Sequence, residues 1–115
     1  MTQIERDPLG RDPHQPGAKL DAGKVRPWLL MSDFPRALEA VAGVATIGAE
    51  KYTDHGWVDV PNGQERYMDA FGRHVLALAR GESHDTGPAG TGCHHKAQAI
   101  WNLLASLELE LREGT

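Results

Sequence analysis

The sequence predicts a small all-α protein, and three observations lead to that class. Three segments repeat apolar side chains every three or four residues, the period of one buried helix face. Stretches rich in glycine and proline separate these segments, and no segment alternates apolar and polar residues as a strand would. The chain has 115 residues, a length that suits one domain.

Composition narrows the class of function. The chain carries 12 Lys and Arg against 16 Asp and Glu, a net charge of −4, whereas a nucleic-acid surface would be basic. We therefore expect a small-molecule or protein partner and no DNA partner. Cys93 is the single cysteine, so no disulfide forms within the chain and a reducing, cytoplasmic setting is expected. No secretory signal and no stretch of ~20 apolar residues is visible, so no membrane partner is expected.

Residues 1–27 are interpreted as an irregular N-terminal arm, ahead of an all-α domain over 28–115. Within the arm, "GAKLDAGKVRP" is rich in glycine and lysine, like a phosphate-binding loop. A P-loop is excluded because Gly17 and Gly23 are six residues apart and Val25 replaces the required hydroxyl residue. Two interpretations stay open. The arm is a solvated tail, or it closes over an anionic ligand through three cations, Lys19, Lys24 and Arg26.

The first helix is expected over 35–52. Ser32 or Asp33 can cap it, and Pro35 suits its first turn. Its apolar stripe is expected to be buried and consists of Leu38, Val41, Ala42, Ala45, Ala49 and Tyr52. The loop that follows has one large apolar anchor, Trp57.

The second helix is expected over 64–80. Asn62 and Glu65 resemble a capping box, and Gly81 is a natural stop. The glycine-rich loop 81–92 is long for a compact domain, which indicates a functional role.

The third helix is expected over 94–112. Its predicted buried face consists of Ala97, Ile100, Trp101, Leu104, Leu107 and Leu111. Three helices of roughly 17 residues make a thin core without a disulfide. We therefore predict a homo-oligomer, a dimer or tetramer, and most simply a dimer whose helices complete a four-helix-type bundle.

Polar residues on the third helix fall on one face, because His95, Gln98, Asn102 and Ser106 follow steps of three, four and four. This face is either a solvated stripe or a set of hydrogen-bonding groups that read a base or sugar. On the second helix, Glu65 and Asp69 point the same way. They accompany a charged stripe that is either surface or a metal site flanked by cations for phosphate; its members are Arg66, Asp69, Arg73 and Arg80.

Single candidate residues allow two interpretations as well. His74 lies on a mostly apolar stripe, so it is a hydrogen-bonded core residue or a ligand or base. Glu39 and Glu50 are about 16 Å apart along the first helix, too far to share one Mg²⁺. Glu50 is the better candidate, and Glu39 is assigned to the surface.

Two further site types are disfavoured. Adjacent Cys93, His94 and His95 cannot all point at one tetrahedral zinc ion. The dipeptide His84–Asp85 matches the HD phosphohydrolases, but those enzymes need a larger helical domain with further ligands.

The ordered motifs "GAKLDAGKVRPWLL", "ALEAVAGVATIGAEKY", "GW", "RYMDAFGRHVLALARGE" and "HHKAQAIWNLLASLEL" resemble the phage dATP/dGTP diphosphohydrolase-like family. That family is a relative of the all-α MazG-like nucleotide pyrophosphohydrolases. The resemblance covers residues 17–109. It implies an oligomeric, Mg²⁺-dependent enzyme, with Mn²⁺ as an alternative ion. Such an enzyme would cleave a purine deoxynucleoside triphosphate to the monophosphate and pyrophosphate, in the host cytoplasm if phage-encoded.

The resemblance also implies metal ligands. MazG-like enzymes carry an E-x-x-E pair on one helix and E-x-x-D on the next. Here Thr46 lies four residues before Glu50, so one carboxylate of the first pair remains. The second motif reads Arg66 to Asp69, with Glu65 one position off. We expect Glu50 and Asp69 to hold the metal, with Glu65 a possible third ligand.

The remaining assignments follow the needs of phosphoryl transfer. The expected phosphate-binding residues are Lys51, Arg66 and Arg73, with the arm residues Lys19, Lys24 and Arg26. Either His74 or Asp85 would orient the attacking water. His95, Gln98 and Asn102 would read the base or sugar. The alternatives are a non-catalytic helical module that binds a nucleotide or protein, and an HD-type triphosphohydrolase.

Overall fold

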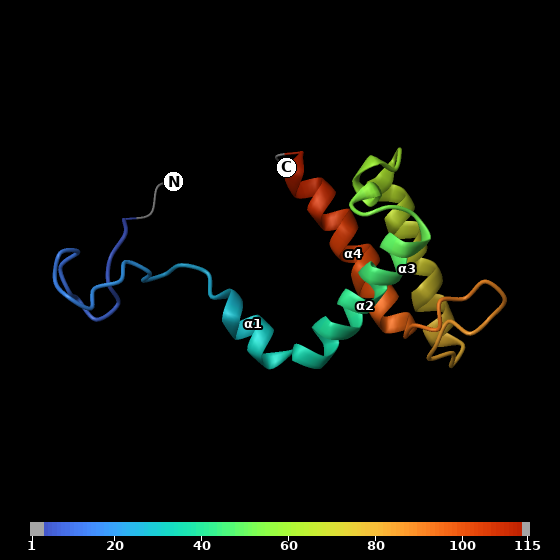
Figure 1. The fold of residues 1–115 in the computed structure, drawn as a ribbon, viewed down its shortest axis with the longest axis horizontal. Coiled ribbons are helices and arrows are strands. Elements are labelled where there is room, and N and C mark those ends of the chain that lie inside the picture. The colour runs from blue at the N-terminus through green and yellow to red at the C-terminus, as the bar shows by residue number, and fades with distance from the viewer. Residues whose placement is uncertain (1–3, 114–115) are drawn as a thin grey trace. The chain divides into compact units, whose positions relative to one another are not determined.

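The computed structural model describes residues 4–113 and is helical (Figure 1). Its elements are α1 (Pro27–Asp33), α2 (Pro35–Lys51), a short 3₁₀ helix η1 (Gly56–Asp59), α3 (Gly63–Ala79) and α4 (His95–Arg112). Residues 4–113 contain no strand, and one isolated bridge pairs His84 with His94. The predicted all-α class is confirmed. No helix in this range is long and apolar enough to span a bilayer.

The chain forms two compact units, residues 1–33 and 34–115. The division follows Asp33 because α1, a helix that the sequence analysis did not anticipate, belongs to the first unit. Its apolar side chains are exposed, and Trp28 is 73% exposed.

The first unit is folded around the buried carboxylate of Asp7. Its two oxygens accept hydrogen bonds from the backbone N–H groups of Leu9 (2.6 Å) and Lys19 (3.1 Å). The Leu9 bond lowers the pKa of the Asp7 carboxyl most, and burial opposes it. A backbone bond from Ala22 to Arg6 (2.9 Å) closes the unit. The arm therefore has more structure than its composition indicates.

The start of α2 differs from expectation. Ser32 donates its hydroxyl to the Leu29 carbonyl at 3.3 Å, inside α1, and Asp33 is the last residue of α1. Neither residue caps α2, so that prediction is wrong. Phe34 occupies the N-cap without a side-chain bond, while Pro35 stands in the first turn as predicted. The stripe on α2 is buried only in part: Val41 is buried, whereas Ala42, Ala45 and Tyr52 are exposed.

The predictions for the two ends of α3 have different outcomes. Asn62 occupies the N-cap in the left-handed region (φ 56°) and makes no side-chain bond, so the predicted capping box does not form. Gly81 ends the helix as predicted, with φ 86°. Its N–H donates to the Leu78 carbonyl (2.9 Å), and the Glu82 N–H donates to the Ala77 carbonyl (3.0 Å). This pair of bonds is a Schellman motif, for which glycine is the favoured residue.

Helices α3 and α4 pack side by side, and α2 contacts α4 (Figure 1). Three aromatic rings join this pair to η1. Tyr67 lies edge-on to Trp101 at 5.5 Å between ring centroids, and Trp57 lies edge-on to both at about 6 Å. The Tyr67 hydroxyl donates to the Trp57 carbonyl at 2.6 Å. Trp57 therefore anchors its loop, as predicted.

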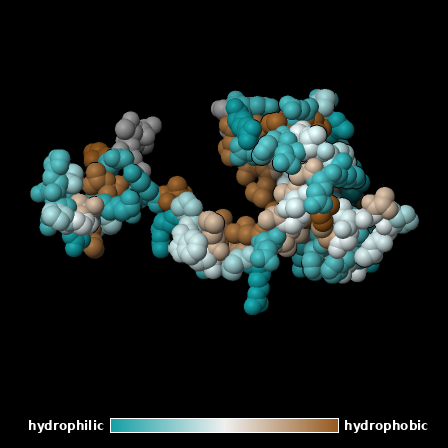
Figure 2. Space-filling view, in the orientation of Figure 1, coloured by the Kyte–Doolittle hydropathy of each residue, from teal (hydrophilic) through white to brown (hydrophobic). Residues whose placement is uncertain are grey.

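The buried side of α4 differs from the side that was predicted to be buried. Its buried side includes three alanines and the polar residues His95, Gln98, Asn102 and Ser106. Of the predicted buried face, Ala97 is buried and Trp101 is half-buried, whereas Ile100, Leu104, Leu107 and Leu111 are 42–57% exposed. The small side chains of α4 are buried, whereas most of its large apolar side chains are exposed. Two interpretations of this polar face were open, and the solvated stripe is the wrong one, because all four polar residues are buried. Figure 2 shows apolar surface along this part of the unit.

Candidate functional site

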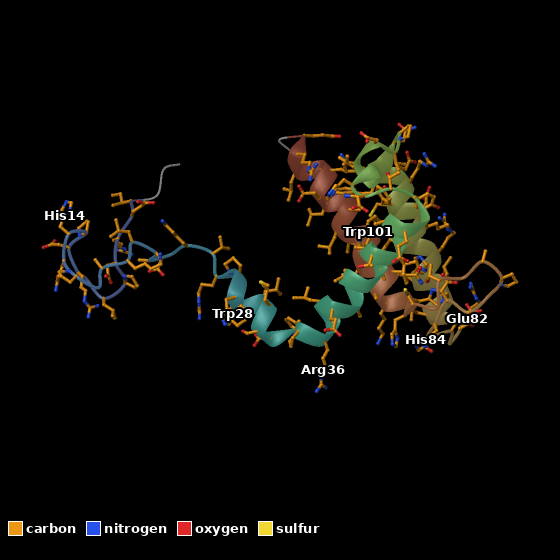
Figure 3. The ribbon with its side chains drawn as sticks, in the orientation of Figure 1. His14, Trp28, Arg36, Glu82, His84 and Trp101 are labelled. Carbon is orange, nitrogen blue, oxygen red and sulfur yellow. The ribbon has the colours of Figure 1, made fainter. Side chains whose placement is uncertain are left out.

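A cavity of about 520 Å³ opens where α3 ends and α4 begins. Its side chains come from α3, from the loop 80–94 and from the first residue of α4. The ionisable ones are Arg73, His74, Arg80, Glu82, His84, Asp85 and His95. Figure 3 shows Glu82 and His84 on the loop that leaves α3, away from Trp101.

Backbone hydrogen bonds hold the loop over this cavity. The Schellman turn at Gly81 reverses the chain, and the N–H of His95 donates to the Ser83 carbonyl at 2.9 Å. Next, the N–H of Asp85 donates to the Cys93 carbonyl (2.9 Å), and the N–H of Gly92 donates to the Asp85 carbonyl (2.8 Å). These bonds join the two ends of the loop and place the first turn of α4 beside α3.

His74 and His95 meet across the two helices. Their Nδ1 atoms are 2.9 Å apart, and their ring centroids are 5.1 Å apart. His95 is 8% exposed and His74 is half-buried. Burial, followed by the nearby His95, lowers the pKa of His74, and the carboxylate of Asp85 opposes this shift. The uncharged form of His74 is therefore favoured in the folded chain.

Charged groups surround the histidine pair. Arg80 and Glu82 form an ion pair at 2.9 Å on the exposed rim; such surface pairs add little stability. His84 lies against His94 with ring centroids 3.9 Å apart, and the Ser83 hydroxyl lies 2.8 Å from its Nδ1. The cavity thus combines guanidinium groups, imidazoles and carboxylates.

Four residues that the sequence analysis selected line this cavity, namely Arg73, His74, Asp85 and His95. Five others are exposed and do not line it; they are Glu50, Lys51, Glu65, Arg66 and Asp69. Within residues 4–113, no three His, Cys, Asp or Glu side chains are grouped so that they could hold a metal ion. The assignment of individual carboxylates to a metal stays a prediction.

Gln98 and Asn102 are buried and do not line the cavity. Asn102 donates its side-chain amide to the Gln98 carbonyl at 2.8 Å, and Ser106 donates to the Gln64 carbonyl at 3.0 Å. The Nε2 of Gln98 is buried and has no hydrogen-bond partner among the described residues. Asn102 and Ser106 therefore satisfy backbone carbonyls. The reading of a base or sugar by His95, Gln98 and Asn102 stays a prediction.

Lys19, Lys24 and Arg26 belong to the first unit, and all three are exposed. Lys24 forms an ion pair with Glu5 at 2.9 Å, so its ammonium group is already partnered. Their role in phosphate binding stays a prediction.

Three ionisable lining residues, Arg80, Glu82 and His84, were not assigned to the site from the sequence. Arg80 lies seven residues after Arg73 on the charged stripe of α3, and this spacing was the available signal. His84 was considered only as part of an HD dipeptide. Glu82 gave no signal, because it reaches the cavity only through the turn at Gly81.

The fold and this cavity define a small all-α protein with a site that combines arginine, histidine and carboxylate side chains. Residues 14–115 match the family described as dATP/dGTP diphosphohydrolase, N-terminal, and the chain belongs to that family. The predicted resemblance to dATP/dGTP diphosphohydrolases is confirmed.

One relative is a protein of Salmonella phage PMBT28 named dATP/dGTP diphosphohydrolase. It is 41% identical to this chain over 88 residues, which make up 76% of this chain and 28% of the relative. The chain therefore spans less than a third of that protein's length. No solved structure matches the chain.

Proposed function

We propose that this chain provides the nucleotide-hydrolysing site of a dATP/dGTP diphosphohydrolase in phage nucleotide metabolism. It would cleave a purine deoxynucleoside triphosphate to the monophosphate and pyrophosphate. The family and the name of the phage relative support the substrate class. The cavity between α3, the loop 80–94 and α4 is the observation that carries the proposal.

The chemistry of the cavity suits a triphosphate. Its volume of about 520 Å³ lies within the ~300–1,000 Å³ of small-molecule sites. Arg73 and Arg80 line it, and guanidinium groups bind phosphate oxygens through paired hydrogen bonds. Lys51 and Arg66 would extend phosphate binding beyond the cavity, and the first unit would add Lys19, Lys24 and Arg26.

The proposed metal ion is Mg²⁺ or Mn²⁺. Glu65 and Asp69 are one turn apart on the exposed side of α3, and Glu50 is exposed in the last turn of α2. Mg²⁺ commonly takes one or two carboxylates and fills its other positions with water and substrate phosphates. The hard oxygen donors of these residues fit that requirement without a three-residue cluster. When bound, the ion would neutralise charge on the phosphate oxygens.

The test of the proposed function is a hydrolysis panel. The protein is incubated with each deoxynucleoside triphosphate and either Mg²⁺ or Mn²⁺, and the products are identified by chromatography. Pyrophosphate with dGMP or dAMP is the expected result. Release of tripolyphosphate would favour an HD-type triphosphohydrolase, since His84 and Asp85 both line the cavity. Nucleotide binding without turnover would favour a non-catalytic module.

A matched pair of variants tests the metal assignment. Glu50→Gln should lower turnover at least tenfold, because it removes a negative ligand while keeping the side-chain shape. Glu39→Gln is the control, since this carboxylate is exposed on the same helix and was assigned to the surface. Circular dichroism verifies that both variants are folded. Equal turnover in the two variants would remove Glu50 from the metal site.

We also propose that a second copy of the chain covers the apolar side of α4. Five large side chains, each at least 42% exposed, repeat there at helical spacing; they are Ile100, Leu103, Leu104, Leu107 and Leu111. Within residues 4–113, a single chain buries only five apolar residues, four of them alanines. Two such stripes packed together would form the core of a four-helix-type bundle, which the isolated chain lacks.

Light scattering after size-exclusion chromatography tests the homo-oligomer. The wild type should elute as a dimer or tetramer, and Leu104→Glu should shift it to a monomer, because a charge would be buried in an apolar interface. Val25→Glu is the control, since Val25 is 93% exposed outside the stripe. A monomeric wild type would contradict the homo-oligomer.

A further inference from the structure

We infer that His74 and His95 form an acid–base dyad, in which each ring determines the tautomer of the other. The pair then presents one free Nε2 lone pair and one Nε2–H group at the same cavity. The reaction that the dyad serves rests on the proposed function, whereas the tautomer pattern does not. The inference stands on the 2.9 Å contact between the two Nδ1 atoms and on the position of both rings in the cavity wall.

The tautomers follow from the hydrogen-bond inventory of imidazole. A neutral ring carries one N–H and one lone pair. Two Nδ1 atoms at 2.9 Å need one proton between them, because two lone pairs repel and two N–H groups clash. If His95 donates, its Nε2 keeps a lone pair, and the proton of His74 lies on Nε2. If His74 donates, the roles reverse. Either arrangement yields one base and one donor.

The surroundings hold the two rings of the dyad in place. His95 is buried in the first turn of α4, and a backbone bond to Ser83 holds that turn. The charged groups that line the same cavity are Arg73, Arg80, Glu82 and Asp85, with His84 beside them. Burial lowers the pKa of His74 and favours its neutral form. A neutral dyad keeps its Nε2 lone pair available for a proton at neutral pH.

The dyad would act on the attacking water. The free Nε2 takes a proton from the water as its oxygen forms a bond to the α-phosphorus. The bond from that phosphorus to the bridging oxygen breaks, and pyrophosphate leaves with the electron pair. The Nε2–H of the other ring donates a hydrogen bond to a phosphate oxygen. The ring that gains the proton is the one that already donates through Nδ1, so the contact between the rings survives the transfer. The proton then passes to solvent.

Long-range ¹⁵N–¹H NMR of the full chain tests the dyad without relying on activity. We expect one of the two rings to be the Nδ1–H tautomer and the other the Nε2–H tautomer. In the His74→Gln variant, the signals of His95 should no longer correspond to a single tautomer. His14 is exposed in the first unit. Its signals should be averaged over both neutral tautomers in both proteins. Two Nε2–H tautomers in the wild type would overturn the inference.

Kinetics test the catalytic role. His74→Gln and His95→Gln should each lower kcat by about 10²- to 10⁴-fold, the usual contribution of a general acid or base, with KM changed only a few-fold. His14→Gln is the matched control and should keep wild-type turnover. An active wild type with unaffected dyad variants would overturn the inference while leaving the proposed function standing. An inactive wild type that shows the two tautomers would reject the proposed function alone.

A titration with Zn²⁺ tests the remaining interpretation of the contact. Two nitrogens 2.9 Å apart also match neighbouring ligands on an ion with bonds of ~2.05 Å. The dyad predicts that added Zn²⁺ leaves both tautomers unchanged at equimolar concentration. Stoichiometric binding that is lost in both dyad variants would overturn the inference and identify a metal site.

Discussion

The two ends of the α3–α4 pair are built from different chemistry. At one end, Trp57, Tyr67 and Trp101 interlock edge to face. At the other end, His74 and His95 meet beside an open cavity. Trp101 and His95 are six residues apart, or about 9 Å along α4. The aromatic rings supply apolar contacts at one end of the helix pair. The polar groups lie at the other end.

The difference between the aromatic end and the histidine end has an energetic reason. Rings that pack edge to face bury large apolar areas and add about 0.5–1.5 kcal/mol per pair beyond that burial. Buried polar groups cost free energy unless they are hydrogen-bonded, and the histidine end meets this condition through one contact between rings. We therefore expect substitutions at the aromatic end to change stability and those at the histidine end to change chemistry.

Removing the aromatic end should have the largest effect on stability. Trp101→Ala should lower the free energy of unfolding by about 2–3 kcal/mol, somewhat less than for a fully buried aromatic residue, because Trp101 is half-buried. Urea denaturation measures this change. Trp28→Ala, at a residue 73% exposed, should shift it by no more than about 0.5 kcal/mol. Equal effects would show that the aromatic cluster does not stabilise the helix pair.

Changing the turn that ends α3 should have an intermediate effect. Gly81→Ala should destabilise the chain by about 1–2 kcal/mol, because Gly81 has φ 86° and an L-residue is strained there. Gly72→Ala, on the same helix, should instead stabilise it by about 0.5–1 kcal/mol, since an added Cβ meets no atom within 4 Å. Thermal unfolding of the two variants measures the opposite signs. A stabilised Gly81→Ala variant would contradict the Schellman geometry.

Protonating the histidine end should have the smallest effect. The pKa of His74 is lowered below its usual 6.5, so the unfolded chain binds more protons than the folded chain below that pH. Stability contributed by neutral His74 is therefore complete above about pH 6.5 and is lost as the pH falls. The urea midpoint of the wild type should drop more between about pH 7.5 and 5.5 than that of His74→Gln. Parallel profiles would mean that His74 does not titrate differently on folding.

The sequence predicts the three long helices well and their burial poorly. The expected ranges 35–52, 64–80 and 94–112 differ from α2, α3 and α4 by at most one residue at either end, because periodicity and Gly81 define them. Helix α1 has seven residues, too few for a periodic signal. An apolar stripe also looks the same whether it meets its own chain or another, so the exposure of Leu104 and Leu107 could not be predicted.

The site was predictable as a set of residue types but not as an arrangement. Arg73, His74, Asp85 and His95 were selected for their chemistry, and the structure places all four around one cavity. The contact between His74 and His95 spans 21 residues of sequence. It depends on how far α4 slides along α3, which no local pattern encodes. Glu82 was missed for the same reason, since the turn at Gly81 decides where it points.

The tip of the loop 80–94 is a turn in which the Gly90 N–H donates to the Gly87 carbonyl at 2.8 Å. The bridge between His84 and His94 and the bond from Asp85 to Cys93 close the base, while Pro88 and Ala89 lie exposed at the tip. A short tag or a fluorophore inserted between Pro88 and Ala89 should leave the base closed. The hairpin thus offers a ready position for a reporter of ligand occupancy, a few residues from the histidines and outside the helices that carry them.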